Sequence, residues 1–125
     1  MKRLLTVTAL LELGAGLALL FVPEVFVDLV LRSTLDGLAA MTVARIAGAA
    51  LTALAIACWL ARNDPGSAAA RGMTKAMVLY NLGAVLVLGS AGMLSQVVGI
   101  LLWPAVIIHA AMAVWCVLVV IRKAA

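Results

Sequence analysis

Residues 38–60 read LAAMTVARIAGAALTALAIACWL, an apolar run that contains a single charged residue, Arg45. A helix of this length, rising 1.5 Å per residue, can cross a hydrocarbon layer of about 30 Å. Comparable runs occupy residues 4–22, 73–94 and 97–121. We therefore expect four membrane-spanning helices, because four strands cannot close a barrel and lipid does not tolerate an open sheet edge.

The composition supports the same class. Of the 125 residues, 67% are hydrophobic and 11% are charged, whereas soluble domains are about half apolar and a quarter charged. The mean hydropathy is +1.27. A soluble fold of this size has too little interior for so many apolar side chains. The sequence therefore predicts an all-α integral membrane protein, a four-helix transmembrane bundle that forms a single domain over residues 1–125.

The basic residues are distributed unevenly around the predicted spans. Seven of them flank the spans on one side: Lys2, Arg3, Arg62, Arg71, Lys75, Arg122 and Lys123. On the other side only Arg32 does so. This asymmetry predicts a bacterial cytoplasmic (inner) membrane protein with both termini in the cytoplasm. The net charge of +4 is then a topology signal, and its division among three short segments argues against a nucleic-acid partner.

Four polar residues lie well inside the spans: Glu12, Arg45, Asn81 and His109. A charge at this depth costs at least roughly 2.5–3.5 kcal/mol, so it normally faces protein or water and has a partner. Small residues lie three or four positions from each of the four, as is typical of helix contacts in membranes. We predict that the four side chains converge in the bundle centre and form a ligand-binding site.

Glu12 and Arg45 lie on adjacent antiparallel helices, at depths that differ by about 6 Å. The sequence therefore predicts a Glu12–Arg45 ion pair, with Asn81 and His109 completing its hydrogen bonds. A second interpretation stays open, in which this network only fixes the register of the helices.

An internal repeat indicates how the four helices are arranged. The stretch ELGAGLAL at residues 12–19 matches NLGAVLVL at residues 81–88 in five positions. This similarity predicts two tandem parallel helical hairpins, related by a pseudo-two-fold axis along the membrane normal. Glu12 and Asn81 would then occupy equivalent positions that face the axis.

Two further segments carry local signals. Within residues 23–32 the charged residues Glu24, Asp28 and Arg32 recur every four positions between apolar ones. This pattern predicts a short interfacial helix that begins at Pro23 and contains an Asp28–Arg32 pair. The helix is interpreted either as a lid over an outward-facing cavity or as a surface connector. In the fourth span, Pro104 is expected to bend the helix.

The sequence lacks the residues that several kinds of cofactor binding and catalysis require. The chain has one histidine and two cysteines, and Cys58 and Cys116 show neither pairing nor metal-ligand spacing, so we interpret them as small apolar fillers. A bis-histidine haem would need His109 from two chains. No metal site is predicted, and no phosphate loop or serine nucleophile is present. No catalytic motif is recognised.

A family resemblance rests on the second span. ARIAGAAL at residues 44–51, continuing to WLAR at residues 59–62, resembles the arginine-plus-glycine helix of small bacterial DoxX-like membrane proteins. The resemblance covers mainly this helix and the four-span layout. It implies a four-helix bundle associated with quinone-linked or other lipophile-handling systems, with Arg45 as the matching arginine.

Three functional hypotheses follow. The first is a bundle that binds a lipophilic molecule, a quinone or isoprenoid lipid, alone or as an accessory subunit of a homo-oligomer or larger membrane complex. The second is a proton-coupled exporter, because a membrane glutamate on the first of four short helices resembles the small multidrug resistance exporters. An Arg45 that neutralises Glu12 would argue against this second hypothesis. The third is a lipid-modifying enzyme such as an isomerase, in which Glu12 and His109 share acid–base work.

Overall fold

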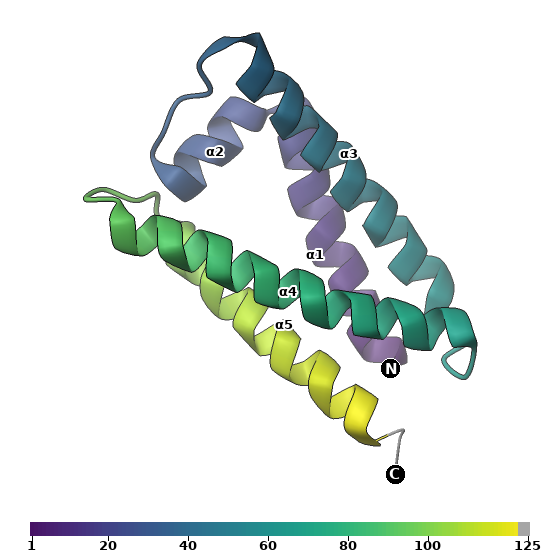
Figure 1. Cartoon of the computed structure of the whole chain (residues 1–125). Coiled ribbons are helices and arrows are strands. Elements are labelled where there is room, and N and C mark those ends of the chain that lie inside the picture. The colour runs from purple at the N-terminus through teal and green to yellow at the C-terminus, as the bar shows by residue number, and fades with distance from the viewer. Residues whose placement is uncertain (123–125) are drawn as a thin grey trace.

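The computed structural model describes residues 1–122 of the chain (Figure 1). Within this part the protein is all-helical, without a strand. Its helices are α1 (Lys2–Phe21), α2 (Pro23–Leu31), α3 (Gly37–Ala61), α4 (Ala68–Leu94) and α5 (Leu102–Arg122). Lys123, one of the basic residues used for the topology prediction, lies outside the described residues.

Four of the helices, α1, α3, α4 and α5, are long and apolar enough to cross a membrane. At most 33% of the most apolar stretch of any of them is buried inside the protein, and for α4 the share is 11%. Most of the apolar side chains therefore point outward, which is stable only where lipid or another apolar surface surrounds them. The chain is a multi-pass membrane protein built as a four-helix bundle with one additional short helix.

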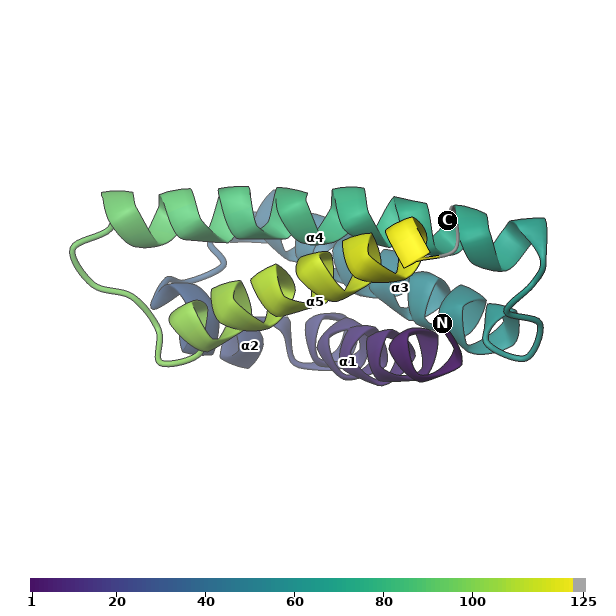
Figure 2. The same cartoon turned by 90° about the horizontal axis from the view of Figure 1, so that it is seen from below.

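The long helices pack as two pairs. Helix α1 lies along α3, and α4 lies along α5 (Figure 1). The pairs approach each other at the end where α1 begins and α5 ends, and they diverge toward the opposite end, where α2 lies between them (Figure 1). The view from below shows α2 and the α4–α5 connection together at that divergent end (Figure 2). These pairs correspond to the two predicted hairpins, while their pseudo-two-fold relation stays a prediction.

Two glycines determine how closely α1 and α3 approach. A Cβ atom added to Gly16 would lie 2.8 Å from the backbone nitrogen of Thr52 and 2.9 Å from the carbonyl oxygen of Gly48. A Cβ atom added to Gly48 would lie 2.7 Å from the carbonyl oxygen of Gly16. The two backbones are in direct contact here, as small residues allow in membrane helix pairs.

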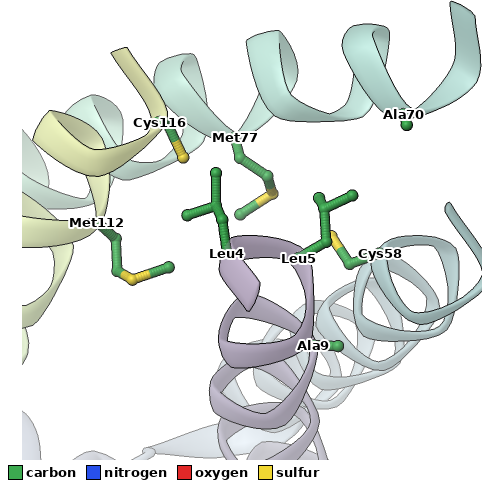
Figure 3. Packing of buried hydrophobic residues seen from close by; sticks show 8 residues of the cluster. All are labelled: Leu4, Leu5, Ala9, Cys58, Ala70, Met77, Met112 and Cys116. Atoms are coloured by element: carbon green, nitrogen blue, oxygen red, sulfur yellow. The ribbon is translucent and has the colours of Figure 1, made fainter. Parts of the chain in front are cut away.

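The buried core lies where the two pairs converge. It contains side chains from all four long helices: Leu4, Leu5, Ala9, Cys58, Ala70, Met77, Met112 and Cys116. Figure 3 shows Leu4 directed toward Met77 and Cys116, with Leu5 beside Cys58. Both cysteines are free and buried, so they act here as apolar fillers.

Helix α2 is attached to the loop between α4 and α5 through backbone hydrogen bonds. The amide of Gly99 donates to the carbonyl of Val30 at 3.2 Å, and the amide of Leu101 donates to that of Leu29 at 2.9 Å. Gly99 is required at this point, because a Cβ atom there would overlap the backbone of Leu29. The contacts join the end of α2 to the second helical pair.

The helix over Pro23–Leu31 and its Asp28–Arg32 ion pair, with a distance of 3.6 Å, are confirmed. The fourth span was predicted from residue 97, but α5 begins at Leu102. Pro104 therefore lies in the first turn of α5, where backbone N–H groups lack a helical partner anyway. The expected bend inside the helix is wrong for this reason.

Candidate functional site

A layer of polar side chains lies next to the core, one helical turn further into the bundle. On α1, Thr8 and Glu12 follow Leu4 and Leu5 on the buried face. On α4, Asn81 follows the core residue Met77 by four positions. On α5, His109 precedes the core residue Met112 by three positions. Helical periodicity therefore directs polar groups from three helices toward the same space.

Glu12 is held by a tyrosine. The hydroxyl of Tyr80 donates a hydrogen bond to Oε2 of Glu12 at 2.9 Å. The glutamate side chain is almost fully buried, with 4% of its surface exposed. No other described residue forms a hydrogen bond or ion pair with it. Oε1 of Glu12 thus has no hydrogen-bond partner among residues 1–122.

Asn81 and His109 form the second polar pair. The amide nitrogen of Asn81 donates to the carbonyl of Met77 at 2.7 Å, which directs its oxygen toward Nδ1 of His109 at 2.9 Å. Because this oxygen can only accept, Nδ1 carries the proton, and Nε2 of a neutral imidazole is an acceptor. No described residue bonds to Nε2. The Tyr80 and His109 rings make an edge-to-face contact with centroids 5.7 Å apart.

Thr8 differs from the other threonines of the long helices. Thr6, Thr42, Thr52 and Thr74 each donate to the carbonyl four residues earlier. The hydroxyl of Thr8 is buried, with 1% of the residue exposed, and it has no hydrogen-bond partner among residues 1–122. Leaving such a group unsatisfied costs about 1–3 kcal/mol. Thr8 therefore supplies a free donor at this layer.

These groups line one cavity of about 140 Å³. Helices α1, α2, α4 and α5 contribute the lining, which consists of Thr8, Leu11, Glu12, Ala15, Phe26, Tyr80, Asn81, Ala105, Ile108, His109 and Met112. Leu11 and Ile108 are also exposed on the outer surface, at 40% and 43%. The cavity thus extends toward the lipid-facing surface between α1 and α5. Phe26 is the residue of α2 that lines it.

The predicted convergence of four residues is correct for three of them. Glu12, Asn81 and His109 line the cavity together, whereas Arg45 does not. Arg45 is exposed and borders a different hollow, beside Glu24 at the junction of α1 and α2. Among residues 1–122 the only ion pair is Asp28–Arg32. The predicted Glu12–Arg45 pair is therefore wrong.

The contact between α1 and α3 explains this error. Because Gly16 meets Gly48 and Thr52, Arg45 is level with the end of α1 near Phe21, with which it shares its hollow. Phe21 is nine residues from Glu12 along α1, a rise of about 13 Å, twice the separation expected from span centres. Arg45 also follows the buried Ala44, so it points about 100° away from the packed face.

Tyr80 belongs to the site but was not predicted from the sequence. Its signal was available, because Tyr80 is the only tyrosine of the chain and lies inside α4, far from either end. A buried tyrosine hydroxyl usually has a hydrogen-bond partner. Nothing in the sequence indicates that the Thr8 hydroxyl has no partner, because threonines in helices normally donate a hydrogen bond to a backbone carbonyl of the same helix.

The residues that line the cavity include Thr8, whose buried hydroxyl has no partner, and two acceptors without a second partner, Glu12 and Nε2 of His109. Among the described lining residues none carries a positive charge. The part of the chain described here also contains no group of three His, Cys, Asp or Glu residues able to hold a metal ion. The arrangement can accept hydrogen bonds from a ligand, donate one to it, and exchange a proton with it.

Comparisons with models of protein families, with curated proteins and with solved structures found no match to this chain. The class of the protein therefore rests on its own features, a four-helix membrane bundle with a small, mostly apolar cavity that contains a few polar groups and is lined by α1, α2, α4 and α5. The resemblance of the second span to DoxX-like proteins is neither supported nor contradicted by these comparisons.

Proposed function

We propose that this protein binds a lipophilic molecule with a neutral ring headgroup, a quinol or the corresponding quinone, in the cavity around Glu12. The unpartnered, buried hydroxyl of Thr8 is the observation that carries this proposal. A protein that used the polar layer only to fix helix register would satisfy this hydroxyl internally, as it does for four other threonines. A ligand oxygen that accepts from Thr8 removes the cost of burial.

The size of the cavity matches a single ring. A volume of about 140 Å³ is close to that of an engineered protein cavity which admits benzene, about 150 Å³. A hydrocarbon tail attached to the ring would leave between Leu11 and Ile108, both of which also face outward. The tail would then lie among the acyl chains of the membrane.

The charge of the lining selects among lipophilic headgroups. A phosphate-bearing isoprenoid would meet the Glu12 carboxylate without a compensating cation from the described lining, which is unfavourable at low dielectric. A quinol hydroxyl can accept from Thr8 and donate to Glu12 or to Nε2 of His109. A quinone has no hydroxyl group, so it can accept a hydrogen bond from Thr8 but cannot donate one to Glu12 or His109. We therefore expect the quinol to bind more tightly than the quinone, with the protein acting alone or as a subunit of a larger membrane complex.

Thr8→Val tests this function, because it removes the free hydroxyl while keeping a side chain of similar size. Binding of a short-tailed benzoquinol to purified protein would be measured by titration calorimetry, with the quinone in parallel. Loss of one hydrogen bond worth about 1 kcal/mol predicts roughly fivefold weaker binding of the quinol. Without ligand, Thr8→Val should have a free energy of unfolding at least as high as that of the parent protein, since the substitution removes no internal hydrogen bond.

Thr74→Val is the matched control. Thr74 is equally buried, but its hydroxyl donates to the carbonyl of Ala70 and does not line the cavity. Its substitution should leave quinol affinity unchanged. If the parent protein binds neither quinol nor quinone, or if Thr8→Val binds them as well as the parent, the proposed function is rejected.

One observation favours a second candidate, a proton-coupled exporter of cationic compounds. Neutralisation of Glu12 by Arg45 was one reason against it, but these residues do not pair among residues 1–122. A buried carboxyl group without a cationic partner can alternate between a proton and a cation. Proton release on adding a lipophilic cation, abolished in Glu12→Gln, would support this candidate, and its absence in the parent protein would exclude it.

A further inference from the structure

A second hollow, of about 230 Å³, lies where α1 ends, α2 begins and α3 passes beside them. Arg45 and Glu24 supply its charged groups, while Phe21, Val25 and Met41 are among its apolar lining residues. It shares no lining residue with the cavity around Glu12. The hollow is therefore a separate feature, and the proposed quinol binding does not use it.

Arg45 is in an unusual position for a charged side chain. It lies eight residues after the first residue of α3, Gly37, which places its Cα about 12 Å along the helix. Its side chain is exposed and has no ion pair or hydrogen bond with a described residue. An arginine at this depth in a membrane extends toward the interface and needs an anion or water there.

Glu24 does not supply that anion. The carboxylate borders the same hollow as Arg45, yet the two side chains are not within ion-pair distance of each other. Two opposite charges thus face one hollow and remain separate. This arrangement is complementary to a molecule that itself carries a negative and a positive group a few ångströms apart.

We propose that this hollow binds the headgroup of a zwitterionic phospholipid, with its phosphate on Arg45 and its ammonium on Glu24. A guanidinium group matches phosphate oxygens with two parallel hydrogen bonds. A primary ammonium group, as in phosphatidylethanolamine, donates directly to a carboxylate. The exposed side chains of Phe21 and Val25 supply apolar surface for the glycerol and the first part of the acyl chains. The outcome is one bound lipid at the divergent end of the bundle.

The test is native mass spectrometry of delipidated protein in detergent, titrated with phosphatidylethanolamine or with anionic phosphatidylglycerol. The parent protein should prefer phosphatidylethanolamine. Arg45→Gln removes the phosphate contact and should weaken binding of both lipids about tenfold, as expected for loss of a charge-assisted contact. Glu24→Gln removes the negative charge that attracts the ammonium group and repels a second anion, so the preference should shift toward phosphatidylglycerol.

Arg32→Gln provides the matched control. Arg32 is an exposed arginine at the end of α2, paired with Asp28 and absent from the hollow, so its substitution should change neither affinity. Circular dichroism of each variant checks that the helices are retained, and Arg45→Lys should recover part of the binding. Equal lipid binding by the parent and Arg45→Gln would overturn the proposal. The proposal would also be overturned if the parent protein formed dimers and Arg45→Gln were monomeric, since Arg45 would then contact a second copy of the chain.

Discussion

The close contact between α1 and α3 makes a sharp prediction for Gly16→Ala. The new Cβ atom would lie 2.6 Å from Oγ of Thr52, 2.8 Å from its backbone nitrogen and 2.9 Å from the carbonyl oxygen of Gly48. The hydroxyl can rotate away, but the two backbone atoms cannot. Ordinary contact therefore requires the helices to separate by roughly half an ångström.

The expected change in the free energy of unfolding of Gly16→Ala is the sum of two opposing effects. Overpacking of a close helix contact costs about 1–3 kcal/mol, and replacing a helical glycine by alanine returns about 1 kcal/mol of helix propensity. Gly16→Ala should therefore lower the free energy of unfolding by about 0–2 kcal/mol. Unfolding by sodium dodecyl sulfate in mixed micelles, followed by circular dichroism, measures this quantity.

Gly14→Ala is the control on the same helix. A Cβ atom at Gly14 has no neighbour within 4 Å, so this substitution should be neutral or stabilising by up to about 1 kcal/mol. Gly16→Ala combined with Gly48→Ala should cost less than the sum of the single changes, because one separation relieves both. If Gly16→Ala proves as stable as Gly14→Ala, the described packing of α1 on α3 is refuted.

Two other substitutions test separate parts of the structure. Gly99→Ala places a Cβ atom against the backbone of Leu29 and should detach α2 from the α4–α5 loop, which hydrogen exchange would detect as faster exchange of residues 23–31. Gly89 has open space around it, so the control Gly89→Ala should leave the exchange of these residues unchanged. Asn81→Leu removes the acceptor for Nδ1 of His109 and should lower the unfolding free energy by about 1–3 kcal/mol. Unaltered stability in the same micelle assay would show that this hydrogen bond contributes nothing.

The helices and the polar layer could be predicted from the sequence because their signals are local. Span length, hydropathy and charge identify the four long helices, and Glu12, Asn81 and His109 are conspicuous inside them. The Asp28–Arg32 pair needs only the four-residue period of one helix. Each of these inferences depends on residues within a single segment.

The pairing of Arg45 could not be predicted, because it depends on how two helices slide against each other. Glycines at 16 and 48 fix that register through backbone contact, and nothing in the span boundaries encodes it. The bend expected at Pro104 was wrong for a related reason: the apolar run extends into the α4–α5 loop, and the helix begins only at Leu102. Hydropathy describes membrane depth, while helix starts depend on local hydrogen bonds.

Glu12 has its hydrogen-bond partner, Tyr80, on α4 and none on α3. A pair of double-mutant cycles on unfolding free energy measures this directly. Glu12→Leu combined with Tyr80→Phe should show a coupling energy of at least about 1 kcal/mol, and Glu12→Leu combined with Arg45→Gln should be additive within about 0.5 kcal/mol. Strong coupling of Glu12 to Arg45, with none to Tyr80, would show that Glu12 pairs with α3 and not with α4.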